Sequence, residues 1–152
     1  MRRLRRFCCI FALLAMFVSL LSGCSADERA VEAVVNQFLE GWAKNDIVLI
    51  DLSMAGFVSF STGGEPDTVP VFALAPRYAT PRWPADAKPS YVSAEGIRIV
   101  ENTATTSALF VVHDSTEKMI MKFEMDFGLI YKDEAWLIAS IKEISVAPDL
   151  AP

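Results

Sequence analysis

Histidine, a residue type that often carries acid-base chemistry, occurs once in this chain of 152 residues. Because His113 stands alone, a metal site built from several histidines is excluded. Asp114 follows it, but adjacent residues of a strand point to opposite faces, so a catalytic dyad of the two is a poor prediction. We expect His113 to be an exposed residue where a strand enters the turn that begins at Asp114.

Methionines at three positions offer a different kind of site. Met119, Met121 and Met125 alternate along the chain together with Phe123, so thioethers and a ring share one face of a strand. Unbranched thioethers pack adaptably. This face is interpreted either as ordinary hydrophobic core, which is favoured, or as the wall of a pocket for an apolar ligand. The lining of such a pocket would be Trp42, Met119, Met121, Phe123 and Met125.

The strand that carries these residues is predicted to run from Lys118 to Tyr131. Apolar side chains alternate with mostly polar ones over this range, which is typical of a strand with one buried face. At about 3.3 Å per residue the strand would span roughly 45 Å, so we expect it to bend. Its other face carries Lys122, Glu124 and Asp126, which we interpret as a solvated surface with cross-strand pairs.

A long strand with one apolar face needs a helix to cover it, and the preceding chain supplies one. Ser25 and Glu28 have the spacing of a capping box, and apolar residues then recur every three or four positions as far as Trp42. This helix ends before Asp46, which can cap a second helix that continues to about Met54. Two helices are therefore expected before the first strand.

The rest of the domain is interpreted as strands around a loop-rich insert. Prolines crowd residues 65–89, where we expect one short helical turn and a flap held to the body by apolar side chains, with a disordered segment as the alternative. These side chains are Phe72, Leu74, Tyr78 and Trp83. The expected strands are Phe57–Ser61, Tyr91–Val100 with a bulge at Gly96, Thr105–His113, Lys118–Tyr131 and Trp136–Ile144. Short polar turns make the last three an antiparallel meander, so the fold class is α+β.

Residues 1–23 are interpreted as an export signal. Arg2, Arg3, Arg5 and Arg6 precede an apolar run from Phe7 to Leu21, which is shorter than the about 20 residues that a membrane span needs. Loss of these arginines leaves 10 basic and 19 acidic residues, a net charge near −9. Such an acidic domain argues against nucleic acid as a partner.

The apolar run ends in Leu21, Ser22, Gly23 and Cys24, which together resemble the lipobox of bacterial lipoproteins. The resemblance implies cleavage before Cys24 and a lipid on its thiol, which would anchor the mature chain to a membrane. It also implies an exported envelope protein. The outer membrane is favoured if the host has one, because Ser25 stands where lipoproteins of the inner membrane often have Asp. An ordinary cleaved signal and a retained short anchor are the alternatives.

Cysteine chemistry is excluded from the mature domain by the same interpretation. Cys8 and Cys9 fall in the leader, and lipid occupies Cys24. No thiol is then left for a disulfide, a thiolate metal site or a nucleophile. We therefore expect neither a metal site nor a cofactor.

The order of elements resembles the nuclear transport factor 2-like superfamily, which includes SnoaL-like domains. The similarity covers about Asp27 to Ile144, and its most specific segment is the turn at residues 132–134 followed by Trp136-Leu137-Ile138. The resemblance implies a domain over residues 24–144, followed by a tail at 145–152. It also implies a curved antiparallel sheet wrapped round the N-terminal helix into a cone, often with a pocket at the open end. The fold does not imply an activity, because it serves enzymes, binders and scaffolds.

An enzyme of this superfamily would place Asp, His or Tyr on the inner surface of the cone. The candidates under this alternative are Asp51 on the second helix, Tyr91 near the open end and Tyr131 at the end of the long strand. The inner face of that strand otherwise offers no acid and base pair. Catalysis is therefore the less favoured prediction.

We expect a lipid-anchored, non-catalytic envelope protein whose cone binds a small apolar ligand or a protein partner. A SnoaL-like enzyme and a structural accessory subunit are the alternatives. Apolar residues also interrupt the polar face of the sheet, at Leu109, Val111, Ile120 and Ile130. They predict either a homodimer through this face or partial cover by the insert.

Overall fold

The computed structural model describes residues 26–146, apart from the side chain at position 146. The leader, the lipobox from Leu21 to Cys24, Ser25 of the capping box and residues 147–152 of the predicted tail lie outside the described residues, whereas residues 145 and 146 of that tail belong to the last strand. No helix in the described part of the chain has the length and apolar character needed to cross a membrane.

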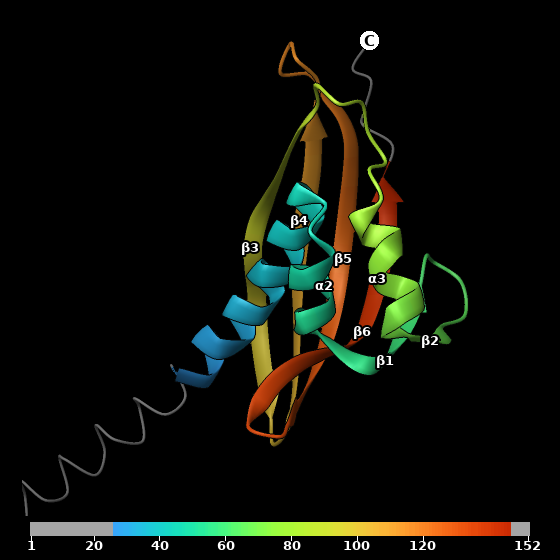
Figure 1. Cartoon of the computed structure of the whole chain (residues 1–152). Coiled ribbons are helices and arrows are strands. Elements are labelled where there is room, and N and C mark those ends of the chain that lie inside the picture. The colour runs from blue at the N-terminus through green and yellow to red at the C-terminus, as the bar shows by residue number, and fades with distance from the viewer. Residues whose placement is uncertain (1–25, 147–152) are drawn as a thin grey trace, which may run out of the picture.

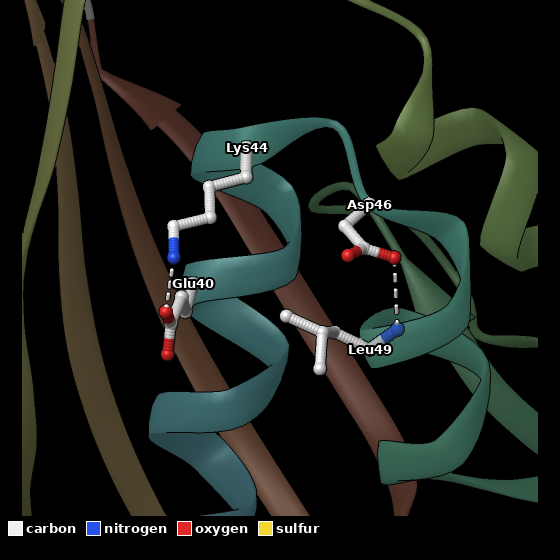
Figure 2. Close-up of polar contacts among 4 residues, drawn as sticks. All are labelled: Glu40, Lys44, Asp46 and Leu49. Atoms are coloured by element: carbon white, nitrogen blue, oxygen red, sulfur yellow. Dashed lines mark hydrogen bonds and ion pairs between the residues drawn. The ribbon is translucent and has the colours of Figure 1, made fainter.

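The N-terminal helix covers residues 26–44 and buries one apolar stripe. The buried side chains of the stripe are Val31, Val35, Phe38, Leu39 and Trp42. On the solvent side, Lys44 pairs with Glu40 one turn earlier (Figure 2). The helix ends at Asn45, whose positive φ of 56° turns the chain, and the backbone N–H of Asp46 donates to the carbonyl of Gly41 at 2.7 Å.

α2 (Ile47–Ser53) begins at Asp46, as predicted. The Asp46 carboxylate accepts from the backbone N–H of Leu49 at 3.3 Å, as Figure 2 shows, and from that of the residue before it at 2.9 Å. The helix packs closely against the N-terminal helix at Gly41, where a Cβ would lie 2.9 Å from the Ile50 side chain. A glycine at this position is what allows the two helices to approach.

Six strands form one curved sheet in the order β2-β1-β6-β5-β4-β3. They are β1 (Met54–Ser61), β2 (Asp67–Pro70), β3 (Lys88–Val100), β4 (Thr103–His113), β5 (Met119–Lys132) and β6 (Ala135–Val146). The meander is antiparallel, as predicted, whereas β1 runs parallel to β6. The N-terminal helix and α2 cross one face of the sheet (Figure 1). The predicted α+β class and the curved sheet around the first helix are confirmed, and the space that they enclose is called the cone below.

The proline-rich residues 65–89 hold more regular structure than predicted. β2 pairs with β1 at the edge of the sheet, and α3 (Val71–Ala79) is longer than a single turn. Leu74 and Tyr78 on α3 are buried, as expected, but Phe72 is 77% exposed. Positions 74 and 78 share one face of a helix while position 72 points away from it, so the expectation that Phe72 holds this segment to the body was wrong.

The predicted bulge in β3 is confirmed. The register of β3 against β4 shifts on both sides of Glu95, and Gly96 has a φ of +63°. The Glu95 carbonyl, freed from the ladder, accepts from the Thr106 hydroxyl at 2.7 Å. The bulge thus bends the edge of the sheet without leaving this carbonyl unpaired.

Candidate functional site

A largely buried ion pair joins the interior of the cone to the loop between α3 and β3. Arg82, in this 80–87 loop, donates from Nη1 to Oε1 of Glu143 on β6 at 2.8 Å. The side chains of Arg82 and Glu143 are 23% and 5% exposed. Charges removed from water to this extent require an oppositely charged partner, and Arg82 and Glu143 are each other's partner.

Glu143 faces inward because β6 contains a bulge. Gly128 on β5 pairs with Ser140, but Leu129 pairs with Ile138, which makes Ala139 the extra residue. Up to Ile138 the even-numbered residues of β6 face inward, and after the bulge the odd-numbered residues do. Glu143 lies after the bulge and is therefore buried. Sequence reasoning missed this carboxylate, because the alternation along β6 was followed only as far as residue 141.

Aromatic rings surround the Arg82 guanidinium. Its Cζ lies 5.4 Å from the ring centroid of Trp42, 5.3 Å from that of Tyr78 and 6.0 Å from that of Phe123. A guanidinium over ring faces at these distances makes favourable cation-π contacts. We call Trp42, Tyr78, Phe123 and Glu143 together the cage.

Further rings hold the cage in place. Trp42 stacks on Phe110 of β4, with centroids 4.0 Å apart and an angle of 20° between the planes. Tyr78 packs edge-on against Phe38 of the N-terminal helix at 4.9 Å. Trp83, next to Arg82 in the loop, lies 5.6 Å from Phe110. Because these rings come from two helices, a strand and a loop, the walls of the cage are fixed by the fold itself.

Four polar atoms of this cluster are buried without a hydrogen-bond partner within the protein. They are Trp42 Nε1, Tyr78 Oη, Arg82 Nη2 and Glu143 Oε2. Burial raises the pKa of Tyr78 well above its usual value, and the nearby charge of Glu143 raises it further, although the two groups fall short of hydrogen-bond geometry. Tyr78 is therefore a protonated donor at neutral pH. Unpaired buried atoms are uncommon and mark a place that water or a ligand can complete.

The predicted pocket lining is divided between this cluster and its surroundings. Trp42 and Phe123 belong to the cage, and their rings lie 5.1 Å apart. Met125 is buried in the core, whereas Met119 and Met121 are half-buried at the start of β5. The structure thus brings two of the five residues together around Arg82, which the sequence interpretation did not include.

The two tyrosines of the catalytic alternative lie far apart. Tyr91 is a lateral neighbour of Phe110 and, through it, of Phe123, whereas Tyr131 stands eight residues further along β5. Eight residues of strand span roughly 26 Å. Tyr131 is exposed beside Trp136, with ring centroids 5.3 Å apart. These tyrosines cannot act on one substrate atom together.

Asp51 and His113 also lie apart from the cage. Asp51 is exposed on α2, and His113 ends β4 half-buried instead of exposed. Asp114 does not face His113, because it holds the following turn. Its Oδ1 accepts from the backbone and hydroxyl of Thr116 at 2.8 and 2.6 Å and from the backbone of Lys118 at 3.0 Å. The Thr116 hydroxyl accordingly lowers the pKa of Asp114.

A hollow of about 420 Å³ lies between the end of the N-terminal helix and the 80–87 loop. Its lining is mostly apolar and uncharged, and consists of Ala43, Asn45, Pro81, Trp83, Pro84, Ala85, Ala87 and Pro89. Trp83 belongs both to this lining and to the ring cluster, so the hollow adjoins the cage. Asn45 contributes a buried Oδ1 that has no partner. The volume and the lining fit a small ligand with an apolar surface.

Two other hollows contain no unpaired buried atom. One of about 640 Å³ lies on the outer face of the sheet and is lined largely by Ser, Thr and Gly, with Asp126 and Lys142 at its side. The other, of about 350 Å³, is a surface groove between α2 and α3 beside exposed Leu52 and Phe72. None of the unpaired buried atoms belongs to a residue that lines either one.

The charged groups of the cluster are engaged with one another. The carboxylate of Glu143 is neutralised by Arg82, and the raised pKa of Tyr78 keeps its hydroxyl protonated. Within residues 26–146, no three His, Cys, Asp or Glu side chains gather where they could hold a metal ion. The carboxylate of the cage, that of Glu143, is thus held in an ion pair.

No family model matches the sequence, and a search of curated proteins found no match. Solved structures do resemble it. An NTF2-like protein with a cystatin-like fold from Novosphingobium aromaticivorans superposes with a TM-score of 0.67 at 13% identity, over 91% of this chain and 90% of that chain. An NTF2-like protein of unknown function from Shewanella baltica has a TM-score of 0.58 at 18% identity, over 80% of this chain and 95% of that one.

A third similar structure is described as a ketosteroid isomerase-like protein from Erwinia carotovora atroseptica. Its TM-score is 0.59 at 13% identity, over 79% of this chain and 96% of that chain. Identities this low show the fold alone. The nuclear transport factor 2-like, cystatin-like fold expected from the order of elements is therefore confirmed, and function must be argued from the site.

Proposed function

We propose that this protein is a lipid-anchored component of the bacterial envelope whose cone is a non-catalytic binding module. Its ligand would be a small molecule with an apolar surface, bound where the hollow beside Trp83 meets the cage. The observation that carries the proposal is the hollow of about 420 Å³, lined mostly by alanines, prolines and Trp83, next to buried polar atoms that have no partner.

The anchor is supported by the sequence. Leu21, Ser22, Gly23 and Cys24 have the residue types of a lipobox, and they follow a positively charged segment and an apolar run. Only Ser25 separates Cys24 from the first described residue of the N-terminal helix. A lipid on Cys24 would hold the domain close to the membrane surface, with the outer membrane favoured.

The absence of catalysis is supported by the state of the polar groups in the cone. The similar protein from Erwinia is described as ketosteroid isomerase-like, and an isomerase needs a base that is free to accept a proton. Here Glu143 is engaged by Arg82. An isomerase is therefore the competing proposal, and it would require Arg82 to leave before Glu143 could act.

Native mass spectrometry of the full chain, released gently from membranes, tests the binding function. We expect a retained small molecule whose mass adduct is lost when Trp83 is replaced in Trp83→Ala. The matched control is Trp136→Phe, because Trp136 lies at the other end of β6 from Glu143. A protein that carries no ligand but turns over a ketosteroid would contradict the proposal in favour of the isomerase.

A further inference from the structure

We propose that the cage around Arg82 is a binding site for a small, weakly hydrated organic cation, such as a quaternary ammonium or a substituted guanidinium. The cation enters when the 80–87 loop withdraws Arg82, which otherwise occupies the cage as an internal ligand. The inference rests on the proposed function, because it names the chemical class of the ligand that the cone binds.

The chemistry of the cage matches such a cation. Three ring faces, those of Trp42, Tyr78 and Phe123, stand within 6.0 Å of the Arg82 guanidinium carbon. Glu143 supplies the opposite charge from a position that is almost fully buried. Ring faces attract cations that shed water easily, and a buried carboxylate adds the full counter-charge.

Arg82 is the replaceable member of this arrangement. Trp42 stands on the N-terminal helix, Tyr78 on α3, Phe123 on β5 and Glu143 on β6, whereas Arg82 stands on a loop. Withdrawal of the loop would therefore empty the cage and leave its walls in place. Arg82 is also the more exposed partner of the ion pair, at 23% against 5%, so its route to solvent is short.

The loop is held to the cone by side chains. Of its backbone hydrogen bonds, one runs from Thr80 to Pro76 in the last turn of α3 and one from Ala87 to Pro84 within the loop, and neither reaches the sheet. The hollow of about 420 Å³ behind it adjoins Trp83. Opening would thus break the Arg82–Glu143 pair and the ring contacts, but no ladder of the sheet.

The native arginine leaves the cage incompletely satisfied. Glu143 Oε2 and Arg82 Nη2 have no hydrogen-bond partner while Arg82 is in place, so one oxygen of the carboxylate is left unengaged. A cation with its own substituents competes for the same space, and the acidic charge of the domain favours its approach. The apparent affinity is then set by the fraction of molecules in which Arg82 has left.

Titration of the full chain with tetramethylammonium chloride tests the proposal. The protein is purified in a sugar-headed detergent, which carries no ammonium group, and the indole N–H signals of its three tryptophans are followed by NMR. We expect the signals of Trp42 and Trp83 to shift and to saturate, while that of Trp136 stays unchanged. Potassium chloride at equal concentration is the control for ionic strength.

Variants then separate the cage from general surface binding. Arg82→Ala should bind tetramethylammonium about tenfold more tightly than the native chain, because the internal competitor is gone. Arg77→Ala is the matched control, since Arg77 also lies over a ring, that of Phe60 at 4.5 Å, but outside the cage. Adding Glu143→Gln to Arg82→Ala should abolish the binding. Unchanged affinity in Arg82→Ala, or retained affinity in the double variant, would overturn the proposal.

Circular dichroism shows whether Arg82→Ala folds. If it does not, methylguanidinium at millimolar concentration should restore its folding, and sodium chloride should not. Failure of this rescue, or a native chain whose tryptophan signals ignore tetramethylammonium, counts against the cage.

The mass spectrometry described above distinguishes the two proposals. A retained ligand that is uncharged would overturn the cation site and leave the binding function standing. A protein without ligand that catalyses a reaction would remove the binding function itself.

Discussion

Ser140 on β6 occupies the space in which a side chain at Gly128 on β5 would begin. A Cβ at position 128 would lie 2.3 Å from the Ser140 hydroxyl oxygen, closer than atoms can approach. The two residues are cross-strand partners at the bulge that turns Glu143 inward. The glycine therefore belongs to the mechanism that builds the cage.

Gly128→Ala should destabilise the protein by about 1–3 kcal/mol, the usual cost of overpacking. Urea unfolding of the two proteins measures the difference. Gly56→Ala is the control, because a Cβ at Gly56 meets nothing within 4 Å. Adding Ser140→Ala to Gly128→Ala should restore most of the loss, because it deletes only the clashing hydroxyl oxygen and keeps the Cβ, which would lie at an ordinary 3.6 Å. A double variant no more stable than the single one would show that the clash is not the cause.

The partners of the ion pair should differ in the effect of their removal. Arg82→Ala leaves the carboxylate of Glu143 buried and unpaired, at a cost of about 3–5 kcal/mol. Glu143→Ala should cost less, because Arg82 is on a loop and can turn toward solvent. Urea unfolding of both variants checks the order, and equal losses would indicate that the loop does not move.

Tyr78 should make folding stability depend on alkaline pH. Burial, together with the charge of Glu143, raises its pKa in the folded protein above the value of about 10 found in unfolded chains. Between these values the unfolded chain loses a proton that the folded protein keeps, so stability is full below about pH 10 and falls as pH rises. Urea unfolding at neutral and alkaline pH measures the fall.

Tyr78→Phe should remove the part of the alkaline loss of folding stability that Tyr78 causes. At neutral pH the variant should have nearly the same free energy of unfolding as the native chain, because the hydroxyl that it deletes has no hydrogen-bond partner. Tyr131→Phe serves as the control, since Tyr131 is 42% exposed. An identical alkaline profile for the native chain and Tyr78→Phe would refute the assignment.

Replacing Cys24 should release the protein from the membrane. In Cys24→Ala the thiol that would carry lipid is missing, so the protein should move from the membrane fraction to the soluble fraction. Immunoblots of fractionated cells measure the distribution. Cys9→Ala controls for the loss of a thiol in general, and a Cys24→Ala protein that stays with the membrane would argue against the lipobox.

The outer face of the sheet is proposed to form a homodimer. Val92 is 44% exposed there, and Leu109, its partner across the β3–β4 ladder, is half-buried. Val92→Lys should shift the protein from dimer to monomer in light scattering at micromolar concentration, because it places a charge in the contact. Val48→Lys on α2 should have no effect, and a native chain that is already monomeric would remove the proposal.

The sequence was sufficient for the elements whose pattern is local. Asp46 predicted the start of α2, and Gly96 predicted the bulge of β3. The alternation of apolar residues predicted which face of β5 is buried. Each of these signals lies within a few residues of the feature that it predicts. The α+β fold followed from the order of these elements. The parallel pairing of β1 with β6 had no such signal, because it joins segments about 80 residues apart.

The candidate site depended on contacts that no local pattern contains. Glu143 faces the cone only because Ala139 is inserted into β6, and Arg82 reaches it from a loop 61 residues earlier. Trp42 and Phe123 were predicted as a lining because their own elements are amphipathic. Two of the four cage residues were therefore accessible from periodicity, whereas the placement of Glu143 and its pairing with Arg82 required the fold.

The parallel pairing of β1 with β6 also determines when the domain can fold. A chain made from its N-terminus presents the N-terminal helix, α2 and β1 first, but β1 has only β2 beside it until β6 has been synthesised. Glu143 lies on β6 as well, so Arg82 has no partner for its ion pair until this last strand has been made. Completion of the sheet and pairing of the two charges are thus both postponed until the last strand has been made.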